Sequence, residues 1–449
     1  MIKLTTMSSA FTATKKKTHI AHITHLSHDG RGIANLNGKV TFLRGGLAGE
    51  KVEFTYLKQH RQYDEGQVLD VLEAAAERIA PVCEHFGVCG GCSLQHMQPT
   101  QQITMKQLAL LDQLARIGGT QPETILPPLT AQTTGYRHKA RLGVKYVPAK
   151  GKVLVGFREL NGRYITDMQR CAVLHPSVGE KLTALASLIQ SLEARSSIPQ
   201  IEVAVSDDVT GLIFRHLEAL SAADQAKLSA FASQANIHLY LQPGGPKTVH
   251  KLWPTDDSLL LQYALPEQHI VVNFHPSDFT QVNPQLNRQM VARALSLLDP
   301  QPHERILDLF CGLGNFTLPL ARYCQEITGV EGEAELIARA TDNAKFNQLD
   351  NIRFYTTDLS QNFSEQPWAK TSYDKILLDP PRTGALEIIQ SIAQFKAKLI
   401  LYISCNPATL ARDSKELIQQ GYRLTAAGVM DMFPHTSHVE SIALFRADR

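Results

Sequence analysis

Two short loops of the sequence carry side chains that can take part in covalent chemistry. The DPPR loop (379–382) follows the apolar run 375–378, and the SCNP loop (404–407) follows the apolar run 399–403. Both runs are typical of buried strands, and apolar residues at helical spacing lie between them, so we predict a parallel pair of strands. Ligands bind where such strands end. Cys405 is therefore a candidate nucleophile, although a free cysteine is more often a buried structural thiol.

A second group of residues has the spacing of metal or cluster ligands. Cys83, Cys89 and Cys92 form the pattern C-x5-C-x2-C in a glycine-rich stretch, and Cys171 follows later in the chain. Four thiolates suit either a structural zinc ion or an iron–sulfur cluster, and spacing does not separate the two. Three unrelated cysteines are a poor explanation. An all-sulfur set needs no histidine from the same stretch.

The stretch 306–321 predicts a strand, a tight glycine turn and a helix. The glycines of the turn at 312–314 let the backbone approach a ligand, but a dinucleotide site also wants a third glycine where Thr317 stands. Glu331 ends the next predicted strand, where an acid can hold ribose hydroxyls, and Asp358 ends the third, where an acid can meet an adenine edge. This set favours S-adenosylmethionine over NAD, because that cofactor has no pyrophosphate to cradle.

Polar and aromatic residues precede a long predicted helix that runs through Leu297. Pro284 suits the first turn of this helix and Asn283 suits its cap. Phe279 and Gln281 would then lie at the mouth of the turn. Capping chemistry alone also explains the pattern.

The remaining parts of the chain are predicted to position these loops. Residues 18–74 read as short strands with glycine turns, which predicts a small barrel, and 100–117 predicts an amphipathic helix. Residues 137–170 hold nine Lys and Arg against two acids, which favours an anionic partner. Residues 422–445 predict a strand, a loop and a closing strand that begins near Glu440.

Composition excludes several classes of protein. The 449 residues are 43% hydrophobic and 20% charged, with a net charge of +2, as in an ordinary soluble globular protein of two or three domains. No apolar run is long enough to span a membrane, and the N-terminus has no signal-peptide pattern, so we expect a cytoplasmic protein that starts at Met1 or Met7. Seven cysteines in such a protein indicate metal binding or catalysis before disulfides.

These motifs together resemble the uracil-C5 RNA methyltransferase family. The resemblance covers nearly the whole chain and is carried by the DPPR and SCNP loops and by HVE at 438–440, FTQVN at 279–283 and DLFCGLGN at 308–315. Residues 18–74 also resemble the TRAM domain, an RNA-binding barrel, through their glycine pattern. The resemblance implies an α/β fold of the class I methyltransferase type at 272–449, a TRAM-like barrel at 1–74 and a central α+β iron–sulfur domain at 75–271.

The family resemblance also implies roles for individual residues. Cys405 would be the nucleophile that adds to C6 of uracil, and Glu440 would be the base that removes the C5 proton. Asp379 is close enough to the chemistry to touch the uracil as well. The expected contacts to S-adenosylmethionine are Gln281, Phe310, Asn315, Glu331, Asp358 and Asp379. The expected ligands of a [4Fe–4S] cluster are Cys83, Cys89, Cys92 and Cys171.

The resemblance implies one substrate and leaves alternatives open. The expected activity is methylation of 23S rRNA at uridine 1939 by a monomer without a membrane or an obligate protein partner. The alternatives are a tRNA uridine-54 enzyme, an rRNA enzyme acting at another uridine, a non-catalytic metal-stapled RNA-binding protein and, more remotely, a DNA or small-molecule methyltransferase. A nucleophilic role also predicts that the site lowers the pKa of Cys405 below that of a free thiol.

Overall fold

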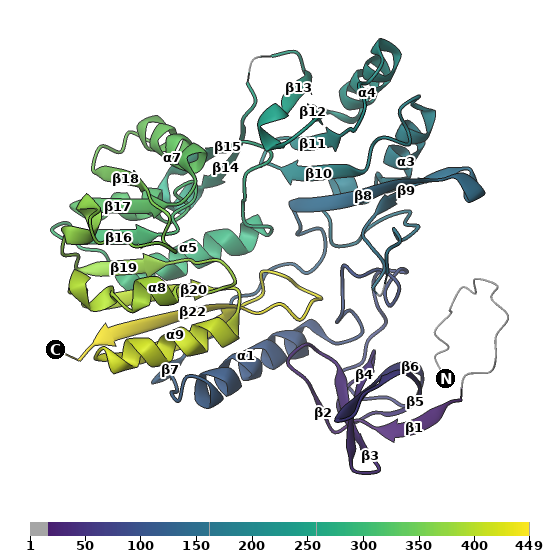
Figure 1. The fold of residues 1–449 in the computed structure, drawn as a ribbon, viewed down its shortest axis with the longest axis horizontal. Helices are drawn as coiled ribbons and strands as arrows, with labels where there is room; N and C mark the ends of the chain where they lie inside the picture. The colour runs from purple at the N-terminus through teal and green to yellow at the C-terminus, as the bar shows by residue number, and fades with distance from the viewer. Residues whose placement is uncertain (1–16, 161, 257, 449) are drawn as a thin grey trace. The chain divides into compact units, whose positions relative to one another are not determined.

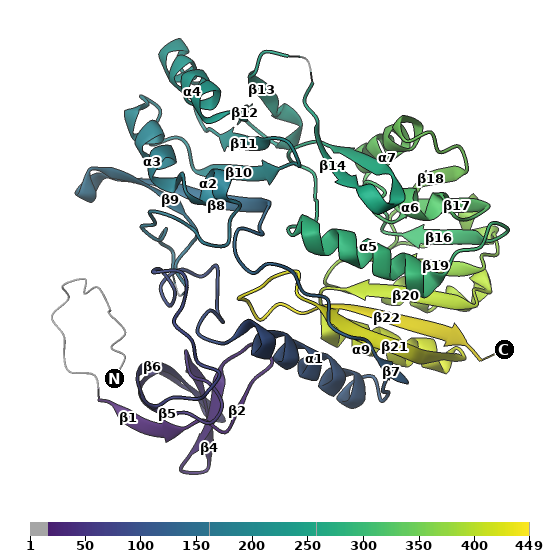
Figure 2. The same cartoon turned by 180° about the vertical axis from the view of Figure 1, so that it is seen from behind.

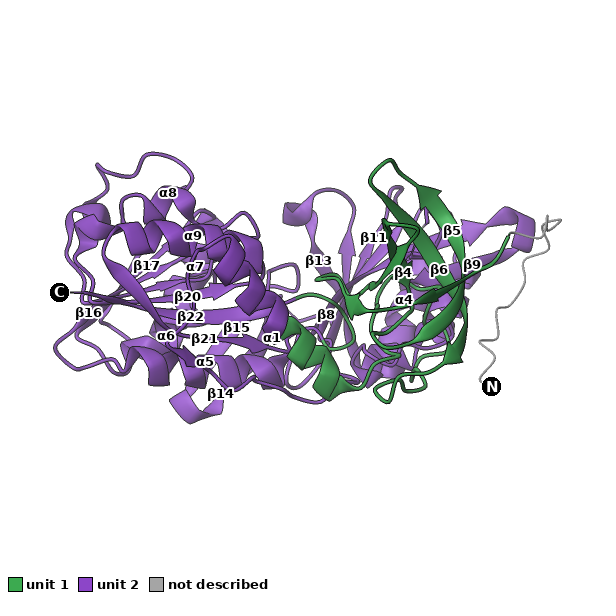
Figure 3. Cartoon of the chain, turned by 90° about the horizontal axis from the view of Figure 1, so that it is seen from below, with its two compact units in different colours: residues 1–106, 434–438 green, residues 107–433, 439–449 purple. Residues whose placement is uncertain are grey.

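The computed structural model describes residues 17–160, 162–256 and 258–448, and the chain divides into two compact units. Unit 1 comprises Met1–Lys106 and Pro434–His438, and unit 2 comprises Gln107–Phe433 and Val439–Arg449 (Figure 3). The predicted three-domain division, with boundaries after residues 74 and 271, stays a prediction. The two candidate start residues lie outside the described residues.

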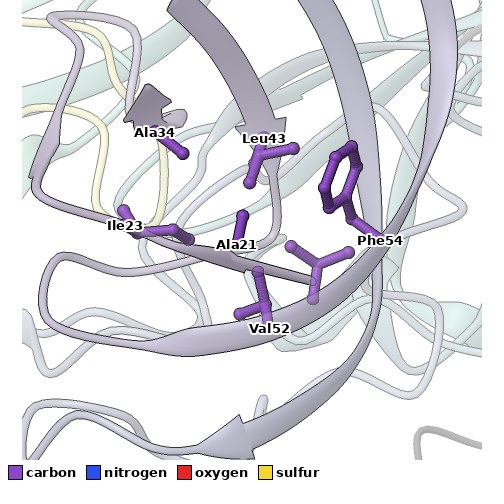
Figure 4. Packing of buried hydrophobic residues seen from close by; sticks show 7 residues of the cluster. Ala21, Ile23, Ala34, Leu43, Val52 and Phe54 are labelled. Atoms are coloured by element: carbon purple, nitrogen blue, oxygen red, sulfur yellow. The ribbon is translucent and has the colours of Figure 1, made fainter. Parts of the chain in front are cut away.

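Unit 1 contains a six-stranded sheet in the order β1-β5-β6-β4-β3-β2, which confirms the predicted all-β N-terminal region. Its strands are β1 (His19–His22), β2 (His25–Leu26), β3 (Gly32–Leu36), β4 (Lys39–Arg44), β5 (Lys51–Gln59) and β6 (Tyr63–Glu73). Inward-facing apolar side chains fill its centre (Figure 4): Ala21, Ile23, Ala34, Leu43, Val52, Phe54 and Val68. A Cβ at Gly66 would lie 2.7 Å from the side chains of both Leu43 and Phe54, so close packing requires glycine there.

A buried ion pair fixes the chain where it leaves this sheet. The Glu50 carboxylate is fully buried and accepts hydrogen bonds from Arg78 Nε at 2.5 Å and Nη2 at 2.8 Å. Glu50 also accepts from the backbone N–H of Leu47 at 2.7 Å, and Arg78 donates to the Gly45 carbonyl at 2.7 Å. Because this bidentate pair is satisfied on both sides, it holds the segment after β6 against the β4–β5 turn.

Unit 2 contains an eight-stranded sheet in the order β18-β17-β16-β19-β20-β22-β21-β7. Its strands are β7 (Thr124–Ile125), β16 (Arg305–Leu309), β17 (Glu326–Glu331), β18 (Ile352–Thr356), β19 (Lys375–Leu378), β20 (Leu399–Ser404), β21 (Tyr422–Met430) and β22 (Glu440–Ala447). The five strands from β18 to β20 are mutually parallel, and β22 pairs antiparallel with both β20 and β21. This arrangement confirms the predicted α/β sheet with an antiparallel closing strand.

Helices cover both faces of this sheet. Helix α5 (Pro284–Leu298) lies on one face and α9 (Pro407–Gln419) on the other (Figures 1 and 2). The other helices along the chain are α1 (Pro99–Arg116), α2 (Pro176–Gly179), α3 (Leu182–Ser191), α4 (Ala222–Ala235), α6 (Thr317–Ala321), α7 (Ala334–Phe346) and α8 (Leu386–Ile389). None of the helices in the described part of the chain is long and apolar enough to cross a membrane.

A second sheet of unit 2 has the order β13-β12-β11-β10-β8-β9, and β14 and β15 form a separate pair. These strands are β8 (Lys139–Val147), β9 (Lys152–Gly156), β10 (Gln200–Val205), β11 (Thr210–Arg215), β12 (Ile237–Gln242), β13 (His250–Trp253), β14 (Leu261–Leu265) and β15 (Ile270–Phe274). The basic stretch 137–170 provides β8, β9 and the loops around them. The predicted central α+β region is therefore present.

The helix expected between the DPPR and SCNP loops is shorter than its apolar spacing predicts. Helix α8 ends at Ile389, and a separate 3₁₀ turn follows at Ile392–Phe395. Ile388, Ile389, Ile392 and Phe395 are nonetheless all fully buried. The spacing thus identifies the buried face correctly, but two short turns bury that face without one continuous helix.

Candidate active site

The register between β20 and β22 places Cys405 opposite Glu440. Ser404 pairs with Ser441 across the two antiparallel strands, and the Ser441 hydroxyl donates a hydrogen bond to the Ser404 carbonyl at 3.1 Å. Cys405 directly follows Ser404 and Glu440 directly precedes Ser441, so both residues lie where this pairing ends, and the Glu440 carboxylate is near enough to raise the pKa of the Cys405 thiol. Cys405 is half-buried and Glu440 is only 6% exposed. The predicted nucleophile and the predicted base therefore lie side by side.

Asp379 lies at the end of the neighbouring strand. Strand β19 runs between β16 and β20, with Leu378 opposite Tyr402, so Asp379 emerges at the same sheet edge as Cys405. Its backbone N–H donates to the Leu309 carbonyl at 3.3 Å. Burial raises the pKa of the Asp379 carboxyl to about 7. The carboxyl can thus hold or release a proton near neutral pH.

Asn406 ties the two chemical loops together. Its Nδ2 donates to the Arg382 carbonyl at 3.0 Å, and its Oδ1 accepts from the Ala408 N–H at 3.1 Å, which caps α9. Pro407 occupies the first helical position, where it costs no hydrogen bond. One asparagine therefore begins the helix and fixes the DPPR loop beside Cys405.

The fully buried carboxylate of Asp413 holds the far side of the DPPR loop. It accepts hydrogen bonds from the Ala385 N–H at 2.8 Å, the Tyr402 hydroxyl at 2.7 Å and Arg412 Nε at 2.8 Å. A side chain at Gly384, whose φ is +82°, would collide with both Arg412 and Asp413. This network could not be predicted from the sequence, because its members are separated along the chain and match no motif.

Opposing charges act on the Cys405 thiol. Burial raises the pKa of Cys405 above its ordinary value, and the carboxylates of Glu440 and Asp379 raise it as well, whereas the Arg382 guanidinium lowers it. The prediction that the site lowers the pKa of Cys405 is therefore wrong for this structure. Desolvation is the largest of these effects, and one cation does not offset it.

Glu331 joins the ends of β16 and β17. Its Oε2 accepts from the Gly312 N–H at 3.1 Å, and its Oε1 accepts from the Gly332 N–H at 2.7 Å. Phe310 has a φ of +65°, and Gly312 and Gly314 also have positive φ, so the chain turns sharply after β16. Oε1 also accepts from the Glu333 N–H at 3.3 Å, whereas Oε2 keeps a second lone pair, which suits a hydroxyl donor of a ribose.

Thr317 has a definite role at the position where a dinucleotide site would want glycine. Its hydroxyl donates to Asp308 Oδ2 at 2.5 Å, inside the core beneath the glycine turn. Burial raises the pKa of Asp308 to about 7. Asp308 and Thr317 are both fully buried, and their hydrogen bond therefore stabilises the glycine turn from inside the core.

Asn315 is held by two residues that the sequence did not single out. Its Oδ1 accepts from the Tyr263 hydroxyl at 3.0 Å and from Asn287 Nδ2 at 2.9 Å, and its Nδ2 donates to Asn287 Oδ1 at 3.0 Å. Tyr263 comes from β14 and Asn287 from the first turns of α5. The sequence holds one signal for this contact, because Asn287 is a polar residue on the face of the predicted helix that is expected to be buried.

The loop before α5 presents an aromatic side chain to solvent. The Phe279 side chain is 73% exposed, and Gln281 is half-buried just before the helix. The Asn283 side chain accepts from the Leu286 N–H at 3.2 Å, which confirms its predicted role as the cap. Lys139 of β8 donates to the carbonyl of Pro276, so the basic stretch supports this loop. Sequence analysis placed Lys139 with an anionic partner and missed this contact.

Asp358 lies beyond β18, two residues after the end of the strand, and is exposed. Hydrogen bonds from the Ser360 hydroxyl at 2.7 Å and the Ser360 N–H at 3.0 Å lower the pKa of its carboxyl. Asp358 is therefore ionised and can accept a donor such as an adenine amino group.

The three clustered cysteines lie on one loop of unit 1. Gly91 N–H donates to Cys89 Sγ at 3.4 Å, and Cys83 N–H donates to the buried Gln95 side chain at 2.9 Å. Backbone donors to sulfur are common where thiolates hold a cluster. Burial lowers the pKa of the nearby His96 to about 3, so His96 is neutral.

Cys171 is a buried residue of unit 2, where its N–H donates to the Gly179 carbonyl at 2.9 Å. Across residues 17–160, 162–256 and 258–448, no three or more His, Cys, Asp or Glu side chains are grouped so that they could hold a metal ion. The donors are all sulfur, which suits zinc or iron, but the described geometry does not assemble them.

Comparisons with protein families match both units. Residues 200–447 match the tRNA (uracil-5-)-methyltransferase family model, and residues 15–69 match the TRAM domain model. A protein of Alcanivorax borkumensis is 52% identical over 425 residues, which is 95% of this chain and 96% of that protein. One of Alkalilimnicola ehrlichii is 52% identical over 427 residues, with the same coverage. Both are named 23S rRNA (uracil(1939)-C(5))-methyltransferase RlmD.

One solved structure shares the fold over almost the entire chain. It is a Pyrococcus abyssi tRNA (uracil-54, C5)-methyltransferase in complex with S-adenosyl-L-homocysteine, with a TM-score of 0.74. The alignment covers 95% of this chain and 100% of that one at 21% identity. At that identity the likeness supports the fold alone.

The charges around Cys405 predict opposite effects for two substitutions. Arg382→Gln removes a cation that favours the thiolate and should raise the pKa of Cys405, whereas Glu440→Gln removes a nearby anion and should lower it. The pH dependence of iodoacetamide alkylation, followed by mass spectrometry of the Cys405 peptide, measures both. The wild-type midpoint should lie above about 8.5, the value for a free thiol.

Arg423→Gln serves as the matched control for the arginine, because Arg423 pairs with Glu123 and Asp448 and does not act on the thiol. It should leave the alkylation profile unchanged. Shifts in the same direction for Arg382→Gln and Glu440→Gln would show that the thiol does not lie between these two charges.

Proposed function

This chain belongs to the tRNA (uracil-5-)-methyltransferase family, and we propose that it methylates C5 of uridine 1939 in 23S rRNA. Relatives that are about half identical over nearly their whole length are 23S rRNA (uracil-C5) methyltransferases, and this chain is a methyltransferase that acts on C5 of uracil in 23S rRNA with S-adenosylmethionine. The proposed target position, uridine 1939, comes from the names of those relatives.

The observation that best supports a covalent mechanism is the opposition of Cys405 and Glu440 at one sheet edge. Carbon 5 of uracil is too weak a nucleophile to take a methyl group directly. Addition of the Cys405 thiolate to C6 breaks the C5–C6 double bond and places its electron pair on the C5 side of the resulting enolate. C5 would then take the methyl group by breaking its bond to the sulfonium sulfur, which leaves S-adenosylhomocysteine, and a base beside the nucleophile can afterwards remove the C5 proton.

Glu440 is suited to that second role. After C5 has gained the methyl group, the Glu440 carboxylate accepts the C5 proton, the C5–C6 double bond re-forms, and the C6–sulfur bond breaks to release the Cys405 thiolate. Glu440 is buried, so little water reaches its carboxylate, and the carboxylate stays available to accept the C5 proton. Asp379, whose pKa is near 7, lies beside the same pair and is proposed to hydrogen-bond the uracil edge.

The cofactor is proposed to lie along the ends of β16, β17 and β18. Bound S-adenosylmethionine supplies a methyl group on a positively charged sulfur. Glu331 would hold the ribose hydroxyls and Asp358 the adenine edge. The complete set of proposed contacts is Gln281, Phe310, Asn315, Glu331, Asp358 and Asp379.

Two regions are proposed to bind the RNA around the target. The TRAM match gives unit 1 an RNA-binding barrel, and the basic stretch 137–170 of unit 2 offers exposed cations such as Arg141. The target base must leave its stack to reach Cys405, and the exposed ring of Phe279 can stack on a displaced base. We further propose that the enzyme acts as a cytoplasmic monomer.

We propose that the cysteines hold a [4Fe–4S] cluster, with Cys83, Cys89, Cys92 and Cys171 as ligands. The all-sulfur donor set, the glycine-rich loop and the amide donor to Cys89 support a cluster site. The membership of Cys171 rests on the family resemblance. No step of the methylation uses these thiols.

The test of substrate is methyl transfer from labelled S-adenosylmethionine to unmodified 23S rRNA and, in parallel, to unmodified tRNA. We expect label as 5-methyluridine at a single uridine of 23S rRNA, located by mapping the product nucleotide. Label on tRNA instead would retain the roles of Cys405 and Glu440 but overturn the proposed substrate.

Substitutions of the two catalytic residues should give different products. Cys405→Ala should abolish methyl transfer, because no adduct forms. Glu440→Gln should accumulate a covalent RNA–protein adduct, since methylation precedes the blocked proton removal, and this adduct should survive SDS electrophoresis. A Glu440→Gln protein that binds RNA but yields no such adduct would exclude Glu440 as the base.

The cluster is tested by metal content and by fold. Cys89→Ser should lose iron and the visible absorption of an iron–sulfur cluster, with lower thermal stability or RNA affinity. Cys324→Ser is a matched control, because Cys324 is a buried cysteine of unit 2 outside the proposed ligand set. Bound zinc in the wild type, or unchanged iron in Cys89→Ser, would refute the assignment.

A further inference from the structure

The loop between β21 and β22 returns to unit 1. Strand β21 ends at Met430 and β22 begins at Glu440, and the segment Pro434–His438 between them belongs to unit 1 (Figure 3). The last residue before Glu440 is again in unit 2. The segment just before the proposed base, Glu440, therefore makes its contacts within unit 1.

His435 makes hydrogen bonds that anchor this segment within unit 1. Its carbonyl oxygen accepts hydrogen bonds from the N–H groups of Ser93 and Leu94, both at 2.9 Å, and its own N–H donates to Gln102 Oε1 at 2.8 Å. Gln102 Nε2 lies 3.2 Å from His435 Nδ1. We name these four interactions the His435 clamp.

Hydrogen bonds within unit 1 fix the orientation of the Gln102 side-chain amide. Its Nε2 also donates to the carbonyls of Leu94 at 3.0 Å and Met97 at 2.8 Å. The side chain is fully buried in the first turns of α1, and His435 is 3% exposed. The amide nitrogen has two hydrogens for these two carbonyls and Nδ1 of His435, so the contact with Nδ1 shares a hydrogen, with Nδ1 as the acceptor.

The backbone of His435 is in a conformation that needs such support. Its φ is +66°, in the left-handed region that residues other than glycine adopt uncommonly, although histidine does so more often than most. Residues in this region persist where surrounding contacts over-determine them, and they concentrate at functional sites. The clamp satisfies the N–H, the carbonyl and one ring nitrogen of His435 together.

We propose that the His435 clamp is a positioning device for Glu440, so that removal of the C5 proton depends on Gln102 and His435. Glu440 is the first residue of β22, where it pairs with Met430 of β21, and four residues of chain separate it from His435. The clamp holds the chain before Glu440, whereas the pairing with Met430 and the Ser441–Ser404 bond hold the strand from Glu440 onward. This inference rests on the proposed role of Glu440.

The proposal predicts a kinetic signature that general destabilisation does not produce. Misplacing a catalytic group by about 1 Å costs on the order of 10²-fold in rate. If only Glu440 is misplaced, Cys405 still adds to uracil and the methyl group is still transferred, so the covalent adduct accumulates while RNA affinity is retained.

The experiment compares Gln102→Met with Gln101→Met in the full-length protein. Gln102→Met keeps the size of the side chain but removes the amide, whereas Gln101 is the exposed neighbour on the same helix. We expect Gln102→Met to lower turnover about 10²-fold and to accumulate SDS-resistant adduct, with RNA affinity within a few-fold of wild type. Gln101→Met should behave as wild type.

A second pair of variants tests the clamp through the backbone. His435→Pro removes the donated N–H and forbids positive φ, whereas His435→Gly keeps the N–H and adopts positive φ freely. Adduct should accumulate with proline and not with glycine. Wild-type turnover in both Gln102→Met and His435→Pro, or loss of turnover without adduct, would overturn the proposal.

Glu440→Gln, run alongside, separates the two levels of inference. If Glu440→Gln gives no adduct, the proposed base itself fails, and the clamp proposal fails with it. If Glu440→Gln gives adduct but Gln102→Met and His435→Pro do not, only the clamp proposal fails.

Discussion

The catalytic arrangement depends on the antiparallel register of β20 against β22. The Ser404–Ser441 pair is the last of this register, and it brings Cys405, from the end of one strand, close to Glu440, at the start of another. A slip of one residue would turn the Glu440 side chain to the other face of the sheet. The side-chain bond from Ser441 to the Ser404 carbonyl, added to the strand ladder, opposes that slip. The neighbouring parallel strands then need only deliver Asp379 to the same edge.

Burial serves the base and opposes the nucleophile at this site. The same desolvation that shields Glu440 from water raises the pKa of Cys405, and the two carboxylates beside the thiol act in the same direction. In the free protein the thiol is therefore mostly protonated at neutral pH, which limits its reactivity toward oxidants. The sequence predicted the opposite shift because the expectation came from what the reaction requires. The shift in the folded chain comes from what surrounds the sulfur.

The features that sequence could predict are local, and those it missed join distant parts of the chain. The DPPR and SCNP loops, the glycine turn and the Asn283 cap each depend on adjacent residues, so their types and spacing were sufficient. Tyr263 and Asp413 act on loops far from them in sequence through single hydrogen bonds. A lone tyrosine or aspartate in an apolar stretch carries no sign of its partner. The roles predicted for the individual site residues remain predictions, although the fold brings Cys405, Glu440 and Asp379 to one edge.

The His435 clamp shows why the amino-terminal unit matters for more than RNA binding. A left-handed histidine costs roughly 1–3 kcal/mol, and three backbone hydrogen bonds at a net 0.5–1.5 kcal/mol each contribute roughly 1.5–4.5 kcal/mol, so the bonds can hold the strained turn. They exist only while α1 and the residues after Cys92 are folded. The loop that leads to Glu440 is consequently ordered by the same segment that carries the clustered cysteines. Under the clamp proposal, a substitution in that segment affects the chain before Glu440, even though none of these cysteines takes part in the chemistry.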